Sequence, residues 1–284
     1  MKQIEIDLNT KWWNLYPNIL FTKVKKGPLS LPEIEILQQN VPFDAKEIGK
    51  YNQLCEIEET VFVPPTYLHI ICMPSHLSLL THKDTGLALF GLIHLSNRIK
   101  QFRGIRKSEL INIKTKFGQL LAHDKGQAIE IITQIFVQSE LVWESSTIFL
   151  KKGKNPIGPE FIAKQIDIDT QYTKELWTFS FFLGQKYALV SGDFNPIHLF
   201  PLSAKLFGMP KHIAHGMYSK AKIMGNIMKE IKSDKFEVTV YFKLPIYLPA
   251  NVIFRKNKEK ELIVFDVVDE KMEKPHLKGY FQTF

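Results

Sequence analysis

Residues Tyr187–His198, which read Y-A-L-V-S-G-D-F-N-P-I-H, place an acid and an imidazole on one short loop. Pro196 fixes its own φ and disfavours the helical region for Asn195, so the loop should be stiff. The carboxylate of Asp193 and the imidazole of His198 could then hold one water molecule between them. Imidazole exchanges protons near neutral pH, and a carboxylate can orient the water or act as the partner acid. The spacing therefore indicates acid–base chemistry on water.

The same loop also has a purely structural interpretation. Asp-x-Asn-Pro is a good turn and helix-capping sequence, in which Asp193 or Asn195 accepts hydrogen bonds from backbone amides. Taken singly, an acid or a histidine in such a loop does not establish catalysis. The functional interpretation rests on the complete string from Tyr187 to His198.

The string resembles the signature of the MaoC-like family of R-specific enoyl-CoA hydratases and dehydratases. That signature has a Tyr or Phe, then Ser-Gly-Asp-x-Asn-Pro-x-His, then a small residue six positions after the His. The matching positions are Ser191, Gly192, Asp193, Asn195, Pro196, His198 and Ala204. Downstream, Ile213–Met217 (I-A-H-G-M) resembles the start of the family's central helix.

This resemblance implies an α+β double hot-dog fold, in which two antiparallel sheets each wrap a central helix and join as a pseudo-dimer. It also implies that Asp193 and His198 are the catalytic pair and that the N–H of Gly216 donates to a thioester carbonyl. A helix N-terminus suits that task because negative charge builds on the carbonyl oxygen during proton transfer. Asn195 would hold the loop or a substrate group, and Ser191 would help to position the substrate.

The activity implied is that of a cofactor-free hydro-lyase of fatty acid metabolism. It would interconvert a trans-2-enoyl thioester plus water and an R-3-hydroxyacyl thioester, carried by CoA or by acyl carrier protein. Candidate ligands of the carrier phosphates are Arg103, Arg106, Lys107 and Lys220, although solvated surface charge also explains them. Two alternatives on the same scaffold are a non-catalytic acyl-thioester binding protein and a thioesterase. The complete Asp-Phe-Asn-Pro-Ile-His string argues against both.

The elements that must position this loop are one helix and many strands. Apolar residues recur at intervals of three and four over Gly216–Ile231, which predicts a helix packed on one side against a sheet, with Ser219 and Lys222 on its polar face. His215, just before this helix, could contact the ligand or pack, and packing is favoured. Runs rich in Ile, Phe and Val predict strands over 109–117, 127–137, 141–151, 175–183, 236–242, 251–255, 262–268 and 277–281. Lys256–Lys260 is predicted to be a charged hairpin tip.

A linker is predicted over 152–159, K-G-K-N-P-I-G-P, since its glycines and prolines continue neither a strand nor a helix. The expected domains are 43–152 and 153–284, after an unassigned extension over 1–42 whose Trp12, Trp13 and Tyr16 could cover a sheet face or a neighbour.

The two halves echo each other. Lys50-Tyr51 precedes Cys55-Glu56-Ile57 as Lys186-Tyr187 precedes Ser191-Gly192-Asp193. Because the N-terminal copy lacks the acid and the Asn-Pro-x-His residues, we expect it to be catalytically silent.

The composition excludes several classes of protein. A chain of 284 residues with 45% hydrophobic and 23% charged residues is neither disordered, collagen-like nor a coiled coil. No apolar run is long enough to predict a membrane span, and the N-terminus lacks the layout of a secretory signal, so we expect a cytoplasmic protein. In that compartment, Cys55 and Cys72 should be reduced thiols.

The net charge and the spacing of the histidines limit the kinds of ligand and partner that are expected. A net charge of +8 suits phosphorylated ligands or an acidic carrier protein. The basic residues are dispersed and no nucleic-acid-binding signature accompanies them, so nucleic acid is not expected. His76, His82 and Asp84 fit no standard metal spacing, so no metal site is expected either. A homodimer of double hot-dogs is an expected assembly.

Overall fold

The computed structural model describes residues 1–7, 29–89, 91–168, 171–231 and 233–284. The expected role of Trp12, Trp13 and Tyr16 lies outside these residues. The chain divides by its contacts into one unit of residues 1–44, 61–95 and 101–162, and a second of residues 45–60, 96–100 and 163–284. Strand β3 (Ile93–Gln101) has residues in both. Since the units interleave along the chain, the domain limits expected from the sequence stay a prediction.

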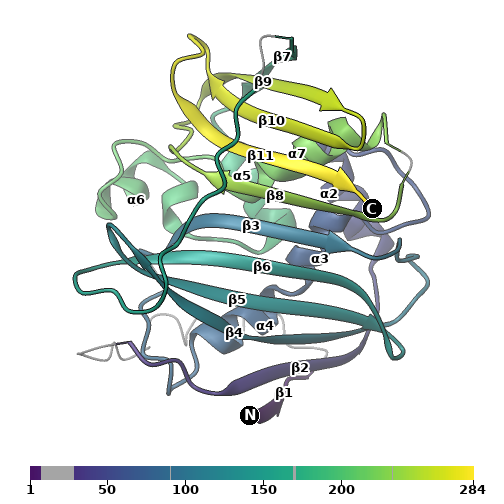
Figure 1. Ribbon diagram of the computed structural model, residues 1–284, viewed down its shortest axis with the longest axis vertical. Helices are drawn as coiled ribbons and strands as arrows, with labels where there is room; N and C mark the ends of the chain where they lie inside the picture. Colours follow the sequence, from purple (N-terminus) through teal and green to yellow (C-terminus); the bar gives the residue numbers. More distant parts are fainter. Residues whose placement is uncertain (8–28, 90, 169–170, 232) are drawn as a thin grey trace. The chain divides into compact units, whose positions relative to one another are not determined.

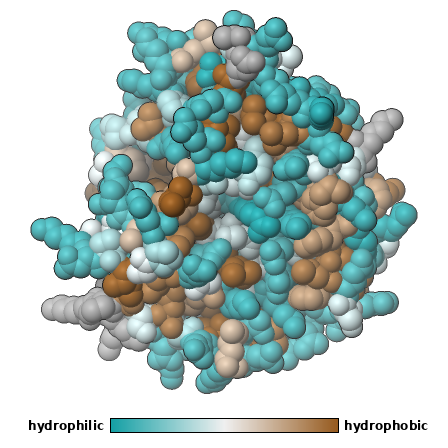
Figure 2. All heavy atoms as spheres, viewed as in Figure 1, coloured by the Kyte–Doolittle hydropathy of each residue, from teal (hydrophilic) through white to brown (hydrophobic). Residues whose placement is uncertain are grey.

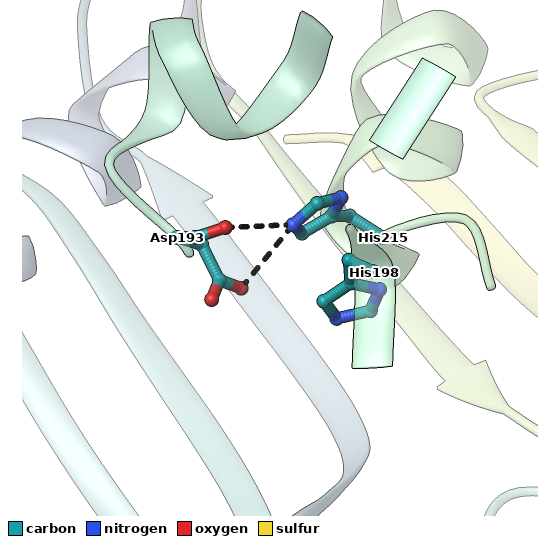
Figure 3. Close-up of side chains that lie close together, drawn as sticks. All are labelled: Asp193, His198 and His215. Carbon is teal, nitrogen blue, oxygen red and sulfur yellow. Dashed lines mark hydrogen bonds and ion pairs between the residues drawn. The ribbon is translucent and has the colours of Figure 1, made fainter. Parts of the chain in front are cut away.

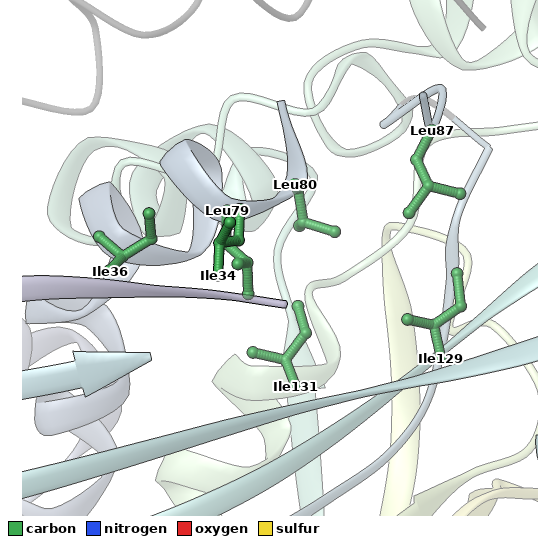
Figure 4. Close-up of a cluster of buried hydrophobic side chains, with 7 residues drawn as sticks. All are labelled: Ile34, Ile36, Leu79, Leu80, Leu87, Ile129 and Ile131. Atoms are coloured by element: carbon green, nitrogen blue, oxygen red, sulfur yellow. The ribbon is translucent and has the colours of Figure 1, made fainter. Parts of the chain in front are cut away.

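In its described residues, the first unit is a mainly antiparallel sheet with two helices. Strand β2 (Ile34–Val41) is followed in sheet order by β4 (Ile111–His123), β5 (Gly126–Val137) and β6 (Glu140–Lys152), and β1 (Lys2–Glu5) runs parallel to β2 (Figure 1). Its helices are α3 (Pro65–Ile71) and α4 (Met73–Leu80). The core forms where α4 lies on the sheet, through Ile34, Ile36, Leu79, Leu80, Leu87, Ile129 and Ile131 (Figure 4).

Antiparallel strands of the second unit follow one another in the order β8 (Phe236–Phe242), β11 (Pro275–Thr283), β10 (Leu262–Asp269), β9 (Ala250–Glu259) and β7 (Thr173–Phe179). Its helices are α2 (Ala45–Cys55), α5 (Leu183–Ser191), α6 (Pro201–Leu206) and α7 (Gly216–Met228), with a short 3-10 turn η1 (Pro196–His198).

Helix α7 contacts both ends of this run of strands. Tyr218 packs edge-on against Phe179 of β7, with ring centroids 5.3 Å apart, and Lys220 bonds the carbonyl of Val238 on β8. The sheet therefore curves around the helix.

The prediction that α7 packs on one side is wrong. Ser219 and Lys222, assigned to its polar face, are buried, as is nearly every residue from Met217 to Ile227. The side of α7 that faces away from the sheet is covered by α2 and by Glu56, which follows α2. Lys222 forms an ion pair with Glu56, and a Cβ on Gly225 would lie 2.8 Å from the carbonyl oxygen of Glu56. A helix between a sheet and another helix has no solvated face.

The predicted strands form, with different ends. Strand β9 pairs with β10 as far as Glu259 opposite Leu262, so the hairpin tip is Lys260–Glu261 and the predicted tip over Lys256–Lys260 is wrong. Strand β7 ends at Phe179 rather than at 183, because α5 begins at Leu183. Residues 153–159 form no helix or strand, as predicted for a linker.

The echo between the halves corresponds to a pair of helices. Helices α2 and α5 pack together, with the rings of Tyr51 and Tyr187 6.2 Å apart. Cys55 and Cys72 are free, buried thiols, as predicted, and burial raises the pKa of both. Within the described residues, no helix is long and apolar enough to cross a membrane. The face in Figure 2 is largely hydrophilic, with separate hydrophobic groups between.

Candidate functional site

The candidate site begins where α5 ends. Gly192 adopts φ 74°, in the left-handed region that favours glycine, and its N–H bonds the carbonyl of Ala188 at 2.8 Å. The next residue, Asp193, is held from both sides: its N–H donates to Ser191 Oγ at 3.2 Å, and its Oδ1 accepts the N–H of Asn195 at 3.1 Å. The end of the helix thus sets the direction of the carboxylate.

Asn195 joins this turn to η1. Its Oδ1 accepts the N–H of Ile197 at 3.4 Å, and its carbonyl accepts the N–H of His198 at 3.0 Å. The structural interpretation of the Asp-x-Asn-Pro turn is therefore correct, and it does not compete with a catalytic one. Ser191 and Asn195 hold the loop, while substrate contacts by either side chain stay a prediction.

His198 is oriented as a base. Its side chain is buried, with 8% of the residue exposed, and its Nδ1 lies 2.8 Å from the carbonyl oxygen of Ile213. That nitrogen must donate, so Nε2 retains its lone pair. Burial lowers the pKa of His198, and the nearby carboxylate of Asp193 opposes this only in part. The imidazole is therefore neutral at neutral pH.

His215 is a member of the site, although packing was the role favoured for it over contact with the ligand. Its ring stacks on that of His198, with centroids 3.7 Å apart and planes inclined by 23°. Its Nε2 donates to the carbonyl oxygen of Asp193 at 3.0 Å and lies 3.7 Å from Oδ2 (Figure 3). Burial lowers the pKa of His215 to about 3. The signal available in the sequence was its position immediately before Gly216 at the start of a helix.

The three functional groups converge. A carboxylate oxygen of Asp193 and one ring nitrogen each of His198 and His215 lie within 4.8 Å of one another. The side chain of Asp193 is 37% exposed, so the acid is open to solvent while the two imidazoles are covered. A water molecule or a small polar group can be held between a carboxylate and an imidazole in this arrangement.

The same three groups fit a metal ion poorly. A bound ion must lie near both ring planes, about 2.0–2.1 Å from each donor nitrogen. Two rings stacked at 3.7 Å and inclined by only 23° direct their lone pairs side by side rather than at one point. The geometry favours acid–base chemistry.

Gly216 is the first residue of α7, so its N–H has no acceptor within the helix. A Cβ at this position would lie 2.6 Å from Cε1 of Phe242. A larger residue would therefore displace the helix start or the ring of Phe242, and the first amide of the helix is directed out of its N-terminus.

The four basic residues predicted to bind the carrier phosphates differ in their burial and bonding. Lys220 is completely buried, and its Nζ donates to Asn97 Oδ1 at 2.6 Å, Asn97 O at 2.9 Å and Val238 O at 3.3 Å. It is part of the core, and its prediction as a phosphate ligand is wrong. The physical reason is the burial of α7 on all sides.

The remaining basic candidates belong to the first unit. Arg103 is bound by the carboxylates of Glu109 and Glu140, each at 2.9 Å. The guanidinium of Arg106 lies 5.4 Å above the ring of Phe62 and is exposed. Lys107 is half-buried. Phosphate binding by these three stays a prediction.

The other histidines considered as metal ligands from the sequence are His76 and His82. His76 is buried, bonds Thr133 Oγ1 at 2.8 Å and has its pKa lowered to about 4 by burial. His82 lies 3.7 Å from Asp84. In the described part of the chain, His76, His82 and Asp84 do not form a cluster with metal-ligand spacing.

Comparison with known proteins gives concordant matches. The model of the MaoC-like domain matches residues 184–278. The 3-hydroxyacyl-thioester dehydratase X of Mycobacterium tuberculosis is 30% identical over 221 residues, covering 78% of this chain and 79% of that protein. The crystal structure of HtdX from Mycobacterium tuberculosis has a TM-score of 0.77 at 26% identity, covering 88% of this chain and 100% of the other. A MaoC-like dehydratase from Phytophthora capsici has a TM-score of 0.75 at 17% identity, covering 90% of this chain and 96% of the other.

Proposed function

Because the chain belongs to the family of MaoC-like dehydratases, we propose that it interconverts a trans-2-enoyl thioester plus water and an R-3-hydroxyacyl thioester. Its enzyme class is hydro-lyase, and the predicted family, α+β hot-dog fold class and enzyme class are confirmed. The double bond geometry, the R configuration and the nature of the thioester carrier are parts of the proposal.

One observation carries the assignment of roles: Asp193 and His198 converge within 4.8 Å, and only the acid is open to solvent. In hydration, the carboxylate and the Nε2 of His198 hold a water molecule, and His198 takes its proton as the oxygen attacks C3. The electron pair of the double bond moves towards the carbonyl, and the proton then returns to C2. In dehydration, His198 accepts the C2 proton and the leaving hydroxyl takes one up through the pair, so water departs and both side chains are restored.

The amide of Gly216 is the proposed donor to the thioester oxygen. Negative charge accumulates on that oxygen when C2 gains or loses its proton. An amide at a helix N-terminus, supported by the helix dipole, stabilises such a charge. The absence of a side chain lets the start of α7 lie against the ring of Phe242, which fixes the position of this amide.

His215 is proposed to position the catalytic pair rather than to move a proton. Its lowered pKa keeps the imidazole neutral, and the Asp193 carbonyl fixes its single N–H on Nε2. Its ring also supports that of His198 from one side. This contact fixes the separation between acid and base.

The N-terminal copy is proposed to be catalytically silent. Glu56, at the echo position of Gly192, is engaged in an ion pair with Lys222 and serves the packing of α2 against α7. CoA and acyl carrier protein present the same phosphopantetheine arm, so either could deliver the acyl group. Assembly into a homodimer stays a prediction.

The test is hydration of a short trans-2-enoyl-CoA by the purified protein, followed by loss of the enoyl absorbance. Asp193→Asn and His198→Gln should fold normally and lose at least about a hundredfold in kcat, the range of general acid–base catalysis. His82→Gln and Asp84→Asn, the same changes outside the site, should retain activity.

Three outcomes would contradict the proposal. Equal turnover by all five proteins would remove the assigned roles. Release of free thiol, detected with a thiol reagent, would indicate a thioesterase. Binding of the thioester without exchange of solvent deuterium at C2 would indicate a binding protein.

A further inference from the structure

Seven large hydrophobic side chains are exposed along one segment of the second unit. They are Phe181, Phe182, Leu189, Phe200, Leu202, Leu206 and Phe207, with 37–80% of each residue exposed. The segment includes α5, η1 and α6 and the loop that carries Asp193. Single exposed hydrophobic residues are ordinary, but a concentration of them on one surface marks an interaction site.

Hydrogen bonds hold the backbone of this segment, and we call its exposed side chains the α5–α6 surface. Gln185 on α5 bonds the carbonyl of Leu199, and Ser203 on α6 bonds that of Pro196 at 2.7 Å. The carbonyl of Phe181 is bonded by His212 Nε2 at 2.8 Å, and the two rings lie 4.6 Å apart. The exposed residues are therefore fixed on folded backbone.

A helix in the position of α5 does not need hydrophobic residues on its exposed face. Helix α2 packs against α5 and repeats its Lys-Tyr pair. Aligned on that pair, Lys46, Lys50 and Gln53 of α2 correspond to Phe182, just before α5, and to Lys186 and Leu189 in α5. All six are exposed. The same face of the same kind of helix is thus entirely polar in one copy and carries Phe and Leu in the copy beside the candidate site.

The α5–α6 surface is also positive. Lys186, Lys205 and Lys211 are exposed, and Asp193 is the only acidic residue between 181 and 215. Phe and Leu beside Lys is the composition of surfaces that bind the interface of anionic membranes. Lysine is depleted in protein–protein interfaces, which makes a protein partner the weaker match.

We propose that the α5–α6 surface binds the surface of an anionic lipid bilayer. The Phe and Leu side chains enter the boundary between headgroups and acyl chains, and the three lysines bind lipid phosphates. Since Asp193 lies on the loop between α5 and η1, binding brings the candidate active site next to the bilayer. The proposal does not depend on the catalytic function.

The test is co-sedimentation of the full chain, without substrate, with two kinds of vesicle at low and high salt. The protein should bind vesicles of phosphatidylcholine and phosphatidylglycerol in equal parts far better than vesicles of phosphatidylcholine alone. Lys205→Gln with Lys211→Gln should weaken binding about twentyfold, since each lysine near an anionic surface contributes about fivefold. Leu202→Ser with Leu206→Ser should weaken it by at least about tenfold, and this loss should persist at high salt.

Matched controls separate this surface from the net charge of the whole protein. Lys46→Gln with Lys50→Gln removes the same charge from α2, and Ile162→Ser removes an apolar side chain that is 78% exposed, against 80% for Leu206. Both should leave binding within about twofold of the unchanged protein. Circular dichroism verifies that each variant is folded.

Failure to bind the anionic vesicles would overturn the proposal. So would equal losses in the test and control variants, which would assign the binding to overall charge. Conversion of a dimer to a monomer by Leu202→Ser with Leu206→Ser, seen by size-exclusion chromatography without vesicle binding, would assign the surface to a second copy of the chain.

Discussion

Gly216→Ala tests whether the start of α7 is positioned for catalysis. The substitution adds one methyl group, whose carbon would lie 2.6 Å from Cε1, 2.9 Å from Cδ1 and 3.0 Å from Cζ of Phe242. Carbon atoms in contact are about 3.5–4.0 Å apart, so the helix start and the ring must separate by about 1 Å. Alanine is otherwise the better helix former. The main effect should therefore be a displacement and not unfolding.

The size of the effect follows from that displacement. If the amide of residue 216 donates to the thioester oxygen, a misplacement of about 1 Å costs about a hundredfold in rate. The loss should fall on kcat, because the amide acts on charge that develops in the transition state. KM for the thioester should change by less than about threefold, since binding in the ground state uses the rest of the ligand.

Phe242→Leu provides the control, because Leu lacks the Cε1 and Cζ atoms that the new methyl group meets. Steady-state kinetics with an enoyl-CoA and urea denaturation would be measured for both single variants and for the double variant. We expect the double variant to recover at least about tenfold of the lost kcat, a coupling that arises only between residues in contact. Full activity in Gly216→Ala, or no recovery in the folded double variant, would refute the assignment of this amide.

Three further predictions concern the site and the core. As the pH falls, kcat/KM should stay constant through pH 6.5 and then drop about tenfold per pH unit. The reason is that burial lowers the pKa of His198 and that the imidazole must be neutral to accept a proton. A fall in kcat/KM that begins above pH 6.5 would contradict this. His215→Phe, which keeps a ring against His198 but loses the bond to Asp193, should lower kcat about tenfold with KM unchanged, and a wild-type kcat would argue against positioning. Lys220→Met should lower the free energy of unfolding in urea by about 3 kcal/mol, since acceptors on Asn97 and Val238 lose their donor, whereas exposed Lys205→Met should change it little.

The loop of the candidate site could be predicted because its conformation is local. Gly192 ends α5, Pro196 stiffens the turn, and Asn195 caps the residues that follow, all within a few positions of one another. Most of the strands could be predicted as well, from runs rich in Ile, Phe and Val, whereas β1, β2 and β3 were not predicted. The ends of the predicted strands were less accurate: β9 extends to Glu259, since pairing with β10 continues along a charged stretch that resembles a turn.

Contacts between distant parts of the chain were decided only by the tertiary structure. Helix α2 covers the second side of α7, so Ser219 and Lys222 are buried although their spacing is that of a solvated face. His215 meets Asp193 and His198 only when the start of α7 packs beside η1. The sequence by itself determined which residue types were available for acid–base chemistry and the local turn that holds two of them. Folding supplied the third residue and the low-polarity surroundings that lower the histidine pKa values, because desolvation depends on every chain segment packed around a group and not on its neighbours in sequence.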